Sequence, residues 1–130
     1  MAGEQIQSRF FKEKSSIQHL TIILSEEEDI LSSLKQALLE NKIHQCKVIE
    51  CSGVIKEGFM NCFWKNSYKA KNLEEIPVSK ASGKFSLGPE GYTGDLHVAV
   101  LIGNQIWQGT LVEGTAKDNF SLKVEFIKFD

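Results

Sequence analysis

Two alternating runs joined by a glycine and an asparagine constrain the fold of this chain more than any other feature. The runs are "LHVAVLI" (96–102) and "QIWQGTLV" (105–112), and Gly103-Asn104 lies between them. Glycine and asparagine tolerate the positive φ angles of a two-residue turn, so the segment predicts an antiparallel β-hairpin. Such a turn also fixes the strand register. His97 is therefore expected directly opposite Thr110.

This register gathers several polar side chains on one face of the predicted hairpin. Because side chains alternate across a strand, four residues share that face: His97, Ala99, Gln108 and Thr110. His97 is the only strong metal-ligand or acid–base candidate among them. On the opposite face Trp107 is expected to join the core, and Gly109, opposite Val98, is expected to allow close packing.

Alternation predicts strands over most of the remaining chain. Residues 17–24 and 120–126 alternate between apolar and polar or β-branched side chains. Glycines 53 and 58 punctuate two further strands within 46–66. Residues 76–87 continue as a strand, and Pro77 favours an edge position because proline cannot donate to a β-ladder.

One stretch has the period of an amphipathic helix. Its apolar stripe consists of Ile30, Leu31, Leu34, Ala37 and Leu38. We expect Ser25 to be the N-cap and Glu28 to complete a capping box. The acidic residues 26–29 would then lie in the first turn, where the helix dipole favours them. The helix is expected to end near Asn41.

These elements define an α+β fold. We expect a single compact domain over residues 1–130, with a mainly antiparallel sheet of about seven strands and one principal amphipathic helix packed on it. Residues 1–16 are expected to form either a loose N-terminal arm or an edge strand. A length of 130 residues, with 42% hydrophobic and 25% charged residues, fits one ordinary globular domain.

The charge balance argues against a strong nucleic-acid surface. The formal net charge is −2, and Arg9 is the only arginine. One stretch nevertheless has the composition of a single-strand binding site, because three lysines lie beside aromatic residues: Lys65, Lys69 and Lys71, near Trp64 and Tyr68. The alternative is a solvated hairpin end, which Glu74 and Glu75 favour because they reduce the local positive potential.

The cysteines and the apolar runs bear on the compartment. Cys46, Cys51 and Cys62 are odd in number and form no CxxC pair, so we expect reduced thiols in a cytoplasmic protein. Buried structural cysteines are favoured, and a reactive thiol remains the alternative. No apolar run approaches the ~20 residues that span a bilayer, so no membrane partner is expected.

The order of these segments resembles the plant and prokaryote conserved (PPC) domain, also called domain of unknown function 296. The resemblance covers roughly residues 17–127. It is carried by "EEEDILSSLKQALLENKI", "IPVSKASGKFSL", "LHVAV" and "GTLVEG". It implies an α+β protomer that assembles as a trimer. Family members are described as predicted DNA-binding proteins in prokaryotes and as association domains beside AT-hooks in plants.

Some prokaryotic members resemble acetolactate decarboxylase and can place a metal on clustered histidines, and the resemblance locates the matching positions here. His97 corresponds to the first family histidine, whereas the second and third fall on Ala99 and Thr110. Glu113 matches the family glutamate. Catalytic zinc typically takes three protein ligands, so this set is too small. No metal and no cofactor are expected.

Three functions follow from these observations. The first is a non-catalytic homotrimeric module for self-association or for binding a protein partner, with weak or indirect DNA affinity. The second is a small-ligand or lyase-like site on the His97 face at a subunit interface, using His97, Thr110 and Glu113. The third is a DNA-binding regulator, which would use Lys65, Lys69 and Lys71 but lacks a helix-turn-helix signature.

Overall fold

Seven strands and one helix account for nearly all of the described chain, as the alternation predicts. The computed structural model describes residues 15–129. The helix is α2 (Ile30–Glu40). The strands are β1 (Ser15–Leu24), β2 (Gln45–Ser52), β3 (Val54–Trp64), β4 (Ser67–Gly88), β5 (Gly91–Ile102), β6 (Gln105–Ala116) and β7 (Phe120–Phe129). The α+β class is therefore confirmed.

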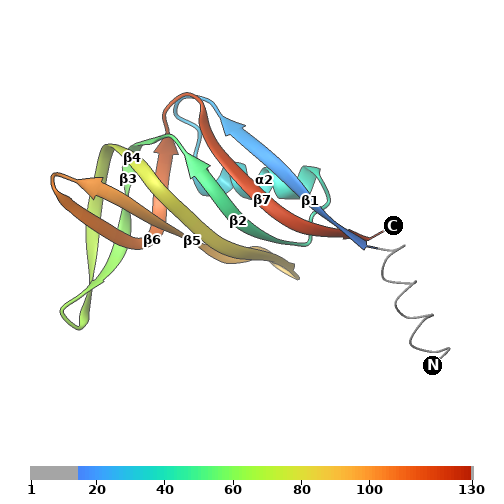
Figure 1. The fold of residues 1–130 in the computed structure, drawn as a ribbon. Coiled ribbons are helices and arrows are strands. Elements are labelled where there is room, and N and C mark those ends of the chain that lie inside the picture. Colours follow the sequence, from blue (N-terminus) through green and yellow to red (C-terminus); the bar gives the residue numbers. More distant parts are fainter. Residues whose placement is uncertain (1–14, 130) are drawn as a thin grey trace.

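The sheet has a free edge at β1, whereas at its other end β5 pairs back onto β4 and closes the sheet on itself. Its strand order is β1-β7-β2-β4-β3-β6-β5, with antiparallel pairing throughout and an additional β4–β5 pairing. The long strand β4 makes this closure, because its first part pairs with β3 and its second part pairs with β2 and β5. The β3–β4 and β5–β6 hairpins curl away from the helix (Figure 1).

Pro77 lies inside β4, and the predicted edge position of this strand is wrong. Pro77 pairs with Val54 of β3, and pairing with β5 begins at Val78. The proline thus stands where β4 changes partners. At this crossover a missing N–H costs the ladder little, so proline is accommodated in a strand that has neighbours on both sides.

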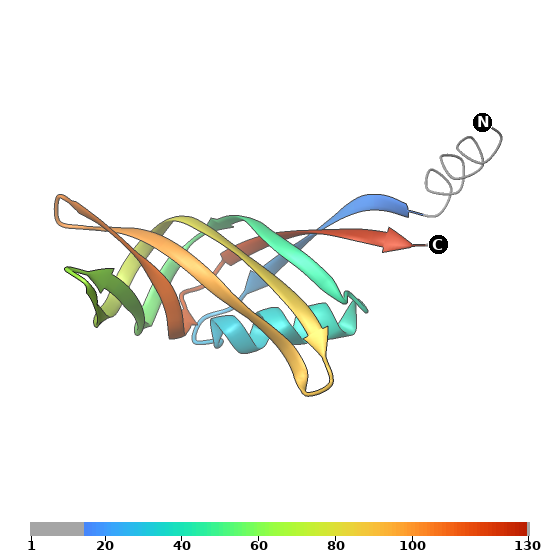
Figure 2. The ribbon, with the colours of Figure 1, turned by 90° about the horizontal axis from the view of Figure 1, so that it is seen from below.

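Helix α2 covers one face of the sheet, which we call the inner face; the opposite face is the outer face (Figure 2). Ile30, Leu34 and Leu38, which recur at helical spacing, are fully buried. They join sheet residues of the same core, among them Phe120 and Leu122. Each such side chain contributes roughly 1.5–3 kcal/mol of hydrophobic stabilisation.

The helix begins later than the capping-box prediction. Asp29 is the N-cap, and its carboxylate accepts a hydrogen bond of 2.8 Å from the Ser32 amide. Glu28 does accept from the Ser25 amide at 3.0 Å, but this bond closes a turn before the helix. Residues 26–28 are instead held by the sheet, because Glu27 and Glu28 exchange backbone hydrogen bonds with Ala116.

Glu26 and Glu27 form ion pairs with Lys56 and do not lie in the first turn of the helix. The Lys56 ammonium lies 3.0 Å from a Glu26 carboxylate oxygen and 2.7 Å from one of Glu27. The side-chain hydrogen bond from Lys56 and the backbone hydrogen bond from Asp118 lower the pKa of Glu26. The predicted first-turn acidic cluster is therefore wrong, whereas the predicted helix end is confirmed, because Asn41 is the C-cap.

The first strand begins two residues earlier than the strand that alternation predicts from residue 17. Strand β1 begins at Ser15 and is the first strand in the sheet order, so Ser15 and Ser16 follow the edge-strand alternative and not the arm. The rest of that arm, residues 1–14 with Arg9, lies outside the described residues. Within the described part of the chain, no helix has the length and apolar character needed to cross a bilayer.

Candidate functional site

Four polar side chains form a row across four neighbouring strands on the outer face. The predicted hairpin register is confirmed, since His97 pairs with Thr110 and Ala99 with Gln108. On the far side of Thr110 its partner in β3 is Asn61, and on the far side of His97 its partner in β4 is Ser82. We call Asn61, Thr110, His97 and Ser82 the polar row.

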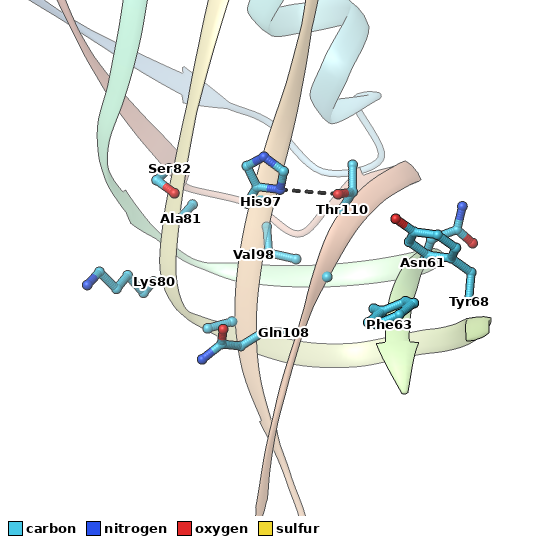
Figure 3. Close-up of a pocket in the computed structure, with 12 residues that line it drawn as sticks. Asn61, Phe63, Tyr68, Lys80, Ala81, Ser82, His97, Val98, Gln108 and Thr110 are labelled. Carbon is cyan, nitrogen blue, oxygen red and sulfur yellow. Dashed lines mark hydrogen bonds between the residues drawn. The ribbon is translucent and has the colours of Figure 1, made fainter. Parts of the chain in front are cut away.

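The centre of the polar row is a side-chain hydrogen bond. His97 Nδ1 and Thr110 Oγ1 lie 3.1 Å apart, and the imidazole tautomer decides which atom donates. The ring points along the sheet toward Thr110, and its other nitrogen points away from this partner (Figure 3). One nitrogen of the imidazole is thus engaged within the chain.

The polar row lies in an open pocket of about 550 Å³. Lys80 and Gln108 line the pocket beside the row, and Phe63 and Tyr68 line its β3–β4 side (Figure 3). The Phe63 and Tyr68 rings pack against each other with centroids 5.1 Å apart. The volume falls within the range of small-molecule pockets, but most of the lining side chains are exposed.

The residues of this pocket do not fit a metal ion. Ala99 offers a methyl group where a second imidazole would stand, and the Thr110 hydroxyl already contacts His97. Across residues 15–129, no group of three or more His, Cys, Asp and Glu side chains is placed to hold a metal. His19 is not near this pocket. It lies on β1 at the open end of the sheet, and its Nε2 is 3.3 Å from Oε1 of Glu125 on β7.

Glu113 lies outside the pocket, although the sequence places it three residues from Thr110. A β-bulge separates them, because Leu111 pairs with Met60 whereas Glu113 pairs with the preceding residue of β3, Phe59. Strict alternation would put Glu113 on the face opposite Thr110, but the extra residue, Val112, returns it to the face of its partner Phe59, two residues along β3 from Asn61. Glu113 is exposed and does not line the pocket.

The three lysines do not form one continuous strip. Lys65 and Asn66, both at positive φ, form the two-residue turn of the β3–β4 hairpin. Lys69 and Lys71 pair with Cys62 and Met60, which are buried, so both lysines belong to the inner face.

Lys71 is also held within the chain. Its ammonium lies 4.3 Å from the ring centroid of Trp107, a cation–π contact. Trp107 itself packs against the core, as predicted. The side chain of Trp64, the other aromatic residue of the predicted site, lies outside those described.

The environment of the three cysteine thiols favours buried structural cysteines over a reactive thiol. Burial raises the pKa of Cys46 to about 11 and that of Cys51 to about 12. Burial also raises the pKa of Cys62, which is 3% exposed. The reactive form of a thiol is the thiolate, so these three free cysteines are largely unreactive near neutral pH.

Fold and site together define a class of protein: a small α+β module with one helix under a partly closed antiparallel sheet, and a polar pocket on the uncovered face. The family model for the Plants and Prokaryotes Conserved (PCC) domain matches residues 11–129. The match spans nearly the whole sequence, so the chain belongs to this family. The resemblance seen in the sequence is thereby confirmed.

Solved structures share this fold at low sequence identity. The plant- and prokaryote-conserved protein of Pyrococcus horikoshii is 18% identical, has a TM-score of 0.70, and the alignment covers 89% of this chain and 82% of that one. A candidate DNA-binding protein of Bacteroides thetaiotaomicron is 19% identical, with a TM-score of 0.70 and 87% and 84% coverage. A metal-containing protein of Archaeoglobus fulgidus is 17% identical, with a TM-score of 0.67 and 87% and 80% coverage. The comparison with curated proteins gave no match.

Proposed function

We propose that this chain is a non-catalytic homotrimeric module that associates through the outer face of its two hairpins. One observation carries the proposal. Four large side chains on this face are each more than half exposed around the polar row: Phe63, Tyr68, Leu101 and Ile106. Exposed apolar surface of this kind, beside polar groups, is typical of protein–protein contact sites.

The register explains how these side chains form one surface. Leu101 pairs with Ile106 at the tip of the β5–β6 hairpin, and Phe63 pairs with Tyr68 at the tip of the β3–β4 hairpin. His97 and Thr110 lie on the same face as Leu101 and Ile106, four residues along their strands from them. A polar row within an apolar rim gives a contact surface both hydrophobic area and directional hydrogen bonds.

The trimer is tested by light scattering on the full chain in solution. The measured mass of the wild-type protein is expected to be three times the 14.6 kDa of one chain. The double variant Leu101→Lys/Ile106→Lys is expected to be monomeric, because two ammonium groups would have to be desolvated in the contact. Leu39→Lys, at an exposed apolar position on the helix, is the matched control and is expected to leave the trimer intact.

Two outcomes would overturn this assignment. One is a wild-type chain that elutes as a monomer at all concentrations. The other is a trimer that survives the double hairpin substitution as fully as it survives Leu39→Lys.

We propose further that DNA association is weak or indirect. The net charge is −2, and the three lysines that the sequence brings together are divided between a turn and the inner face. Few phosphates can therefore be neutralised at once, and the affinity gained from counterion release is small.

A filter-binding titration tests this second statement. Binding at physiological salt is expected to be no tighter than the non-specific range of about 10⁻⁴–10⁻⁶ M. The triple variant Lys65→Ala/Lys69→Ala/Lys71→Ala is expected to change the dissociation constant by less than about tenfold. These three side chains do not share one surface on which phosphates could bind and bases could stack. Tight binding at physiological salt that the triple variant abolishes would contradict the proposal.

A further inference from the structure

Strand β1 is the open edge of the sheet. Each of the other six strands pairs with two neighbours over at least part of its length, whereas β1 pairs only with β7 within the described residues. The pairing with β7 runs without a bulge from Ser15 to Leu24. Figure 1 shows β1 outermost, beside β7 and far from the closed hairpin end. Among residues 15–129, no strand lies beside its second edge, which is a row of backbone groups.

This edge lacks the features that normally prevent pairing between molecules. Residues 15–24, "SSIQHLTIIL", contain no lysine, arginine, aspartate, glutamate or proline. Natural edge strands usually carry such residues, or a bulge, to block association. The outer face of β1 also exposes two isoleucines, Ile17 and Ile23, at 65% and 67%. A long, regular, uncharged edge of this kind favours addition of another strand.

The side-chain pattern of β1 is complementary to itself. When two copies run antiparallel about Leu20, Ile17 of each copy faces Ile23 of the other, and His19 faces Thr21. The same register keeps Leu20, Ile22 and Leu24 on the helix-covered side in both copies, because even positions face even positions. A shift by one residue would instead place the exposed isoleucines against the core-facing positions.

We propose that β1 pairs with β1 of a second copy of this chain, joining two sheets across a two-fold axis. Residues 15–24 contain no lysine, arginine, aspartate or glutamate, so no such like charges oppose each other when two copies of β1 pair. Cross-strand pairs of β-branched residues stabilise such a ladder. The contact uses the opposite end of the sheet from the hairpin face, so it does not depend on the proposed trimer.

Disulfide trapping tests the register in the full chain. His19→Cys and Thr21→Cys proteins are purified separately, mixed and mildly oxidised. Directly opposed positions have Cβ atoms about 4.5–5.5 Å apart, close to disulfide spacing, whereas 19 faces its own copy only diagonally. The mixture is expected to give several times more reducible dimer on a denaturing gel than either variant alone. The wild-type chain, with its three native cysteines, sets the background.

A second substitution separates this contact from the trimer. Ile23→Lys, added to the His19→Cys chain, is expected to reduce the trapped dimer severalfold, because an ammonium replaces an apolar cross-strand contact. Ile106→Lys on the hairpin face is expected to leave trapping unchanged. A mixture that traps no more dimer than the separate variants, or an Ile23→Lys chain that traps as well as its parent, would overturn the proposal.

Discussion

The double variant Ala99→His/Thr110→His is expected to bind one zinc ion per chain. His97 and position 99 lie on one face of β5, and position 110 is directly opposite His97. Three imidazoles from these positions would form the kind of His₃ set that holds catalytic zinc together with a water molecule. Zinc at 100 times its dissociation constant is then expected to raise the free energy of unfolding by about 2.7 kcal/mol.

Two controls make this prediction specific. The single variant Ala99→His has only two imidazoles and is expected to bind zinc much more weakly. Adding His97→Ala to the double variant removes one ligand and is expected to abolish the stabilisation. The measurement is chemical denaturation with and without zinc. A double variant that zinc does not stabilise would show that the three positions do not converge as the register requires.

Gly109→Ala is expected to lower the free energy of unfolding by about 3 kcal/mol. Gly109 precedes Thr110 in β6 and lies opposite Val98 of β5. A Cβ atom added there would overlap the backbone carbonyl of Asn61 and approach Cys62 Sγ to 3.1 Å. Backbone of the neighbouring strand cannot rotate away, so β3 and β6 would have to separate. The same shift would displace Asn61 from Thr110 in the polar row.

Gly114→Ala is the matched control in the same strand. A Cβ atom at Gly114 would meet nothing closer than Leu111 Cδ1 at 3.4 Å, an ordinary contact. Its unfolding free energy is expected to change by less than about 1 kcal/mol. Both variants are measured by urea denaturation at one protein concentration, because self-association also contributes to stability. Equal losses at the two positions would contradict the tight β3–β6 contact at Gly109.

The hairpin of the site was predictable because its determinants are local. A two-residue turn at Gly103, which adopts a φ of 63°, fixes which residues oppose each other up to His97 and Thr110. The helix stripe was predictable for the same reason, since burial of Ile30, Leu34 and Leu38 follows from spacing alone.

The rest of the site depends on pairings between distant segments. Asn61 and Ser82 join the polar row only because β3 pairs with β6 and β4 pairs with β5. No local signal sets those registers, and sequence reasoning missed both residues, together with Phe63 and Lys80. The β-bulge at Val112, which moves Glu113 out of alternation, has no local sequence mark either.

The start of the helix shows how tertiary contacts displace a local signal. The Ser25–Glu28 pair forms the predicted hydrogen bond, yet Lys56 and Ala116 draw the acidic turn onto the sheet and delay the helix to Ile30. Pro77 is a similar case, because a strand that changes partners accommodates a residue that otherwise indicates an edge.

If His97 belongs to a contact surface and not to a metal site, the wild-type chain should retain little zinc. The most direct test is the zinc content of the purified wild-type chain after incubation with zinc and dialysis. We expect far less than one zinc ion per chain, with no change on His97→Ala. One zinc ion per chain in the wild-type protein, lost on His97→Ala, would contradict this expectation.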